Sequence, residues 1–181
     1  MRRDAQQRRQ ALLAAAVDCF QKRGYAVPLE EIADRAGVGR GTLYRNFKDR
    51  AALALAIFER EVEDLAAGTD YELPLGDTLK SLAFRGAQAT ALFNRIAAEM
   101  QLTEEDRAGF RALGQRVEAM LEPIARRGHE KGTLRPEVGA RELAIAMRMM
   151  SALITKYRDK AEAEEHVAIA VGLLLKGLSP A

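Results

Sequence analysis

The stretch LEEIADRAGVGRGTLYRNF, residues 29–47, decides the fold of the N-terminal part of this chain. Apolar residues recur at helical spacing on both sides of Gly37: Ile32, Ala33 and Ala36 before it, and Val38, Leu43 and Phe47 after it. Gly37 can adopt the positive φ at which many helices end. The pattern therefore predicts a helix, a tight turn and a second short helix.

The second of these helices carries polar residues on the face opposite its apolar positions. They are Arg40, Thr42, Tyr44, Arg45 and Asn46. Side chains of these types donate hydrogen bonds to phosphate oxygens and to base edges. A short helix that is held by a turn and carries such donors is typical of a DNA-binding helix-turn-helix.

Charge is distributed unevenly along the chain. The full sequence of 181 residues has a net charge of +2, but residues 1–50 contain 11 Lys and Arg against 6 Asp and Glu, a net charge of +5. The remaining residues contain 17 against 20, a net charge of −3. This asymmetry favours a polyanionic partner at the N-terminal end, although a solvated basic surface would look the same.

The run AGVGRGTLYRNF, residues 36–47, follows an amphipathic helix that ends at Gly24 and Tyr25, and it precedes a helix that opens at Asp49. Over about residues 8 to 60, this arrangement resembles the N-terminal domain of the TetR family of transcriptional regulators. The resemblance implies a double-stranded DNA operator as partner. The expected DNA-binding residues are Arg40, Gly41, Thr42, Tyr44, Arg45, Asn46, Lys48 and Arg50, the last where the family generally has a phosphate-binding Lys.

Two positions depart from the family pattern. Val27 and Pro28 stand where many members have Ser or Thr, and Gly39 stands where the recognition helix usually opens with Ser. We therefore expect both short helices to begin without a side-chain cap.

The rest of the chain shows helical periodicity and no alternation typical of strands. The expected helices cover about residues 4–23, 50–66, 77–100, 104–131, 140–158 and 161–176. Asp49 and Thr103 are expected to open two of them, and Pro123 predicts a kink or a break. The turn-rich segment 67–76 is the best boundary candidate. The predicted fold is all-α, with a three-helix head over residues 1–50 and a helical bundle over 51–181, joined by helix 50–66.

The resemblance also implies a small-molecule effector of unknown identity in the helical bundle. Methionine and aromatic side chains that could line an adaptable apolar pocket are Phe84, Phe93, Met100, Met120 and Met147. Residues of these types at helical spacing are more often ordinary core residues, so both interpretations remain open.

The last two expected helices carry long apolar stripes. The stripe residues are Leu143, Met147, Met150, Ile154, Val167, Val171 and Leu174. Paired across a two-fold axis they would form a four-helix dimer interface, as the resemblance implies. Alternatively, both stripes close the core of the single chain.

No catalytic or metal-binding constellation is apparent in the sequence. His129 and His166 lie far apart and outside metal-ligand spacing, and Cys19 has no neighbouring histidine. A lone cysteine fits a reducing cytoplasm, and no apolar run predicts a signal peptide or a membrane span. We therefore expect a cytoplasmic protein without cofactor, metal or enzymatic activity.

Two functions fit these observations. The first is a ligand-responsive homodimeric transcriptional regulator, most simply a repressor, that binds a pseudo-palindromic operator. The second is an effector-independent, dimeric DNA-binding or architectural protein whose helical bundle only dimerises. The sequence does not distinguish repression from activation, because both use the same DNA-binding head.

Overall fold

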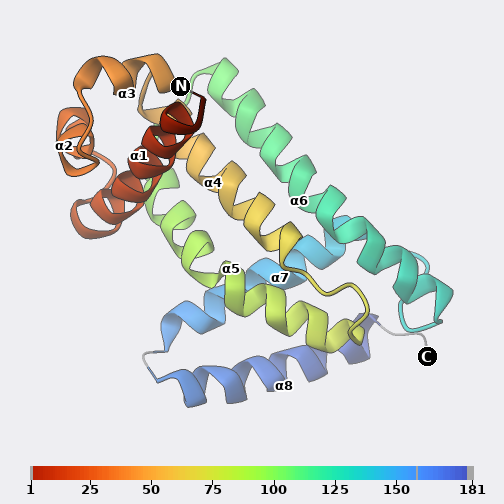
Figure 1. The fold of residues 1–181 in the computed structure, drawn as a ribbon. Coiled ribbons are helices and arrows are strands. Elements are labelled where there is room, and N and C mark those ends of the chain that lie inside the picture. The colour runs from red at the N-terminus through yellow and green to blue at the C-terminus, as the bar shows by residue number, and fades with distance from the viewer. Residues whose placement is uncertain (1, 158, 179–181) are drawn as a thin grey trace. The chain divides into compact units, whose positions relative to one another are not determined.

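The computed structural model describes residues 2–157 and 159–178, and Figure 1 shows the helices that they form. These residues form eight α-helices and no strand, which confirms the all-α prediction. The helices are α1 (Arg2–Arg23), α2 (Leu29–Arg35), α3 (Arg40–Asn46), α4 (Arg50–Ala67), α5 (Leu75–Ala97), α6 (Glu104–Glu130), α7 (Ala140–Lys156) and α8 (Lys160–Leu178).

The chain divides into two compact units. Unit 1 comprises residues 1–60 and 92–113, and unit 2 comprises residues 61–91 and 114–181. Unit 1 thus includes the predicted head together with the start of α4, the end of α5 and the start of α6. A domain boundary after residue 50, with residues 50–66 as connector, stays a prediction.

The ends of the first helices follow from local sequence. Gly24 ends α1 with φ at 86°, and Gly37 lies in the turn between α2 and α3 with φ at 66°. The Asp49 carboxylate accepts a hydrogen bond from the backbone N–H of Ala52 at 2.7 Å, as expected for the residue that opens α4. Helices α2 and α3 begin at Pro28 and Gly39 without a side-chain cap.

The core of unit 1 is built where α1 packs against α2 and α3. Its largest fully buried side chains within the first four helices are Leu12, Phe20, Ile32, Leu43, Leu53 and Ile57. Ala33 is also fully buried. This packing holds α3 by its apolar side and leaves the opposite side exposed to solvent.

The core of unit 2 is formed by residues of α4 to α8, and α7 packs beside α8 as a hairpin of two helices (Figure 1). Residues of the predicted dimer stripe lie inside this core: Leu143, Met147, Met150, Val167 and Val171 are buried, and Ile154 and Leu174 pack against them. The stripes therefore close the core of the single chain. Each of these two helices turns a different face outward.

Helix α6 tests two expectations from the sequence. Thr103 and Asp106 cap its start reciprocally, since the Asp106 N–H donates to the Thr103 hydroxyl at 3.2 Å and the Thr103 N–H donates to the Asp106 carboxylate at 3.0 Å. Helix α6 continues through Pro123 to Glu130, so Pro123 does not break the helix, and a kink at Pro123 stays a prediction. Within residues 2–157 and 159–178, no helix is both long and apolar enough to cross a membrane.

Candidate nucleic-acid interface

Helix α3 presents a polar surface because its apolar side chains are fixed in unit 1. Leu43 and the following Phe47 are buried, whereas Arg40, Tyr44 and Arg45 are exposed. Positions 40 and 44 are four residues apart and share one side of the helix, whereas Arg45 follows Tyr44 directly and lies on the adjacent side. Two guanidinium groups and a phenol are therefore exposed along α3.

Two hydrogen bonds within α3 orient its polar side chains. Arg45 donates to the hydroxyl of Thr42 at 3.2 Å, and the amide of Asn46 donates to the carbonyl of Thr42 at 2.7 Å. Thr42 is half-buried, and Gly41 and Asn46 are exposed. Gly41 adds no side chain, so the backbone at the start of α3 is open to close approach.

Tyr44 is tied to the preceding helix. Its hydroxyl donates a hydrogen bond to the Glu30 carboxylate of α2 at 3.1 Å. This bond raises the pKa of Tyr44. The pKa of Glu30 is lowered because its carboxylate accepts its own backbone N–H and then the Tyr44 hydroxyl. The Tyr44 ring is thus held at the exposed surface, and its hydroxyl is engaged in the hydrogen bond to Glu30.

Lys48 lies directly after α3 and forms an ion pair with α6. Its ammonium is 2.7 Å from the carboxylate of Glu105, and this hydrogen bond raises the pKa of Lys48. Both side chains are mostly exposed, so the pair is worth little for stability. It does place an acidic residue beside one of the predicted DNA-binding cations.

Arg50 is directed into unit 1. Its guanidinium donates hydrogen bonds to the backbone carbonyls of Tyr25 and Val27, and it lies over the Tyr25 ring at 5.4 Å from the centroid. These contacts fasten the first turn of α4 to the connection between α1 and α2. A phosphate contact by Arg50, expected from the resemblance, stays a prediction.

Two arginines of α1 adjoin this surface and were not among the residues singled out from the sequence. Arg8 lines a hollow of about 480 Å³ together with the turn residues Gly37 and Gly39. The Arg9 guanidinium lies 5.2 Å from the centre of the Phe47 ring. The excess of basic residues in the first 50 positions was the signal that could have identified them.

The five residues predicted for an effector pocket lie in both units. Met120 and Met147 are buried in the core of unit 2, with Phe84 packed against it. Phe93 belongs to unit 1 and packs edge-on against Phe58, with ring centroids 5.1 Å apart. Met100 is also in unit 1 and is half-buried. Their grouping into one pocket stays a prediction.

The described residues contain no group of three or more His, Cys, Asp or Glu side chains placed to hold a metal ion. Cys19 is buried in unit 1, and this burial raises the pKa of its thiol.

Comparison with known proteins identifies a family that the N-terminal part of the chain matches. Residues 12–57, which include α2, the turn and α3, match the family described as bacterial regulatory proteins, tetR family. The chain is 46% identical over 63 residues to the HTH-type transcriptional activator FasR of Mycolicibacterium smegmatis. That match covers 34% of this chain and only 29% of FasR, so the likeness to this relative is confined to the N-terminal part.

Solved structures extend the likeness to the whole chain. A TetR transcriptional regulator from Streptomyces coelicolor is 28% identical, with a TM-score of 0.66 over 95% of this chain and 98% of that chain. Salmonella enterica GusR has the same fold, with 21% identity and a TM-score of 0.73 over 95% of each chain. Residues 12–57 therefore match the tetR family of bacterial regulatory proteins, and 95% of the chain shares the fold of a solved TetR regulator.

Proposed function

We propose that this protein is a transcriptional regulator that binds double-stranded DNA as a homodimer and responds to a small molecule. The observation that carries the proposal is the exposed face of α3, where Arg40, Tyr44 and Arg45 project from a helix anchored by buried Leu43. A helix with this arrangement fits the major groove, where arginine side chains read guanine edges and bind phosphates.

Selection of bound sequences from random DNA tests this proposal directly. We expect a pseudo-palindromic site whose half-sites are centred about one helical turn, roughly 34 Å, apart or somewhat further. Arg40→Ala should weaken binding to the selected site and relax base preference within each half-site. Recovery of no common sequence, together with binding that is equal for all DNA, would leave only an architectural role.

The ion pair between Lys48 and Glu105 gives a second test. Glu105→Gln should strengthen DNA binding about three- to tenfold at low salt, because Lys48 is released and a negative charge beside the phosphates is removed. Glu104→Gln is the matched control, since Glu104 pairs with Arg107 of the same helix at 3.2 Å. Titration of labelled operator measures both variants. Equal gains from the two variants would show that overall charge, not Lys48, is responsible.

The proposed dimer uses the outward faces of α7 and α8. Four large apolar side chains are exposed there: Ile145 at 44%, Met149 at 57%, Ile169 at 56% and Leu173 at 66%. On each helix the two residues are four positions apart and so share one face. Exposed apolar stripes of this kind mark association sites, and a second copy of the hairpin would bury them in a four-helix interface.

The direction of regulation follows from where the operator lies in a promoter. Repression is the expectation drawn from the resemblance, whereas FasR is named an activator. We propose repression, in which the bound dimer occupies promoter DNA. A promoter–reporter assay with the selected operator tests this, since deletion of the regulator should raise expression. A fall in expression would assign activation instead.

A further inference from the structure

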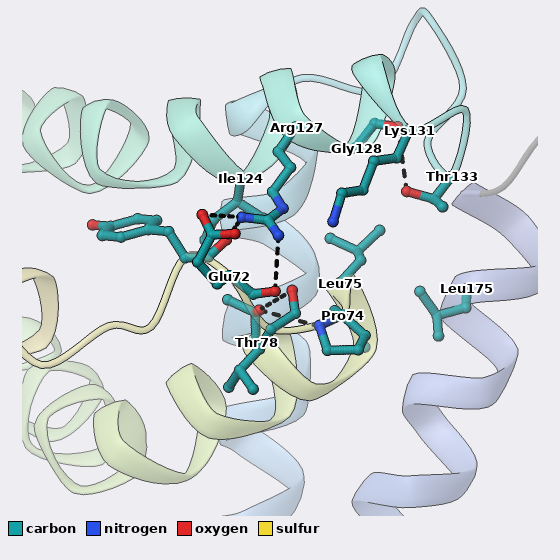
Figure 2. Close-up of a pocket in the computed structure, with 13 residues that line it drawn as sticks. Glu72, Pro74, Leu75, Thr78, Ile124, Arg127, Gly128, Lys131, Thr133 and Leu175 are labelled. Carbon is teal, nitrogen blue, oxygen red and sulfur yellow. Dashed lines mark hydrogen bonds and ion pairs between the residues drawn. The ribbon is translucent and has the colours of Figure 1, made fainter.

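Unit 2 contains a cavity of about 390 Å³. Figure 2 shows that it lies between the connection from α4 to α5, the first turn of α5 and the C-terminal part of α6, with Leu175 of α8 on the far side. Its volume is in the range of small-molecule sites in proteins. None of the five pocket residues predicted from the sequence lines it.

Arg127 fixes one wall of this cavity. Its guanidinium donates to the backbone carbonyls of Tyr71 at 2.8 Å and Glu72 at 2.9 Å, and it forms an ion pair with the Glu72 carboxylate. The Arg127 side chain is only 23% exposed, whereas the Glu72 side chain is 81% exposed. The connection between α4 and α5 is therefore held in place before any ligand arrives.

Lys131 supplies a second cation. It lies four residues after Arg127 on α6, and Figure 2 shows its ammonium directed away from α6 toward the first turn of α5. Within the part of the chain that the structure describes, this ammonium has no hydrogen bond or ion pair. Glu72 forms its ion pair with Arg127, whose hydrogen bond lowers the pKa of Glu72, and the charge of Lys131 adds to this effect. The charged side chains that line the cavity thus have a net charge of +1.

The opposite side of the cavity combines a helix start with apolar side chains. Leu75 and Gly76 are the first two residues of α5, a helix of 23 residues, and both line the cavity. A helix start carries partial positive charge and backbone N–H groups without intrahelical partners. Leu75, Ile124 and Leu175 add an apolar surface.

We propose that this cavity binds a small amphipathic carboxylate, with its anionic end at Lys131 and the start of α5 and its apolar body against Leu75, Ile124 and Leu175. The inference deepens the proposed function, because it names the chemical class of the effector, and it rests on that function for any effect on DNA binding.

Calorimetry on the full chain tests the site with sodium octanoate as probe and octan-1-ol as its uncharged counterpart. We expect saturable octanoate binding with one site per chain and weaker binding of octan-1-ol. Lys131→Met keeps the aliphatic stem and removes the charge, so it should weaken octanoate binding at least about tenfold, as expected for loss of a charge-assisted hydrogen bond. Lys176→Met, at an exposed lysine of α8 outside the cavity, should leave binding unchanged.

Methyl resonances of isotope-labelled leucine and isoleucine locate the bound probe. Shifts at Leu75, Ile124 and Leu175 are expected. Absence of octanoate binding, equal affinity in wild type and Lys131→Met, or shifts confined to other methyl groups would each overturn the inference. Because these titrations contain no DNA, they are independent of the operator selection. Failure of octanoate binding leaves the DNA-binding proposal standing, and failure of operator selection leaves the cavity result standing.

Discussion

Leu173→Glu is expected to convert the proposed dimer into a folded monomer. Leu173 is 66% exposed in the single chain, so the glutamate costs the protomer little. In a dimer the same carboxylate would be taken out of water without a partner, which is strongly unfavourable. Sedimentation should show loss of the dimer at micromolar concentration, while circular dichroism shows the helices and their thermal transition retained.

Loss of the dimer should also reduce operator affinity about 100-fold or more, because two linked heads bind one site far more tightly than either alone. Two controls define the result. Leu73→Glu changes an exposed leucine outside α7 and α8 and should leave the dimer intact. Met150→Glu places a charge at a fully buried position and should unfold the protomer. A wild-type monomer, or a Leu173→Glu dimer of normal affinity, would contradict the proposed interface.

Arg50→Ala is expected to lower the free energy of unfolding of unit 1 by about 2 to 4 kcal/mol. The variant loses two hydrogen bonds from a charged donor and leaves the carbonyls of Tyr25 and Val27 without that donor. It also loses the contact with the Tyr25 ring. Denaturant unfolding followed by circular dichroism measures the change.

Arg45→Ala is the matched control for Arg50→Ala. Arg45 is exposed and donates a hydrogen bond to Thr42 of its own helix, so its removal should change stability by less than about 0.5 kcal/mol. Arg45→Ala should instead weaken DNA binding. It should also flatten the slope of the logarithm of the binding constant against the logarithm of the salt concentration by about one unit. If Arg50→Ala instead leaves the free energy of unfolding unchanged and flattens the salt dependence of DNA binding, then Arg50 contacts a DNA phosphate.

The sequence by itself determined the order of the helices and several of their ends. The positive φ of Gly37 and Gly24, the Asp49 cap and the start of α6 at Thr103 all depend on residues within a few positions of one another. Such effects are readable from local sequence because steric limits and capping bonds act over short separations. The exposed face of α3 was also readable from local sequence, because it lies opposite the apolar positions of that helix.

The tertiary structure alone decided which partners the charged residues take. Arg50 reaches carbonyls 23 and 25 residues earlier in the chain, and Lys48 meets Glu105 on α6. A long basic side chain can lie along a protein surface or turn inward, and nothing in its local sequence states which. Its partners become visible only when distant segments are brought together.

The tertiary structure also decided which apolar faces are covered. Periodicity showed that α7 and α8 each have an apolar stripe, but not that Met150 and Val167 fill the core of unit 2 while Met149 and Leu173 remain exposed. The cavity is a similar case, because its walls come from residues 71–78, 124–133 and 175. Local spacing defines a helix face, whereas what covers that face, or leaves a space beside it, depends on packing between segments far apart in the chain.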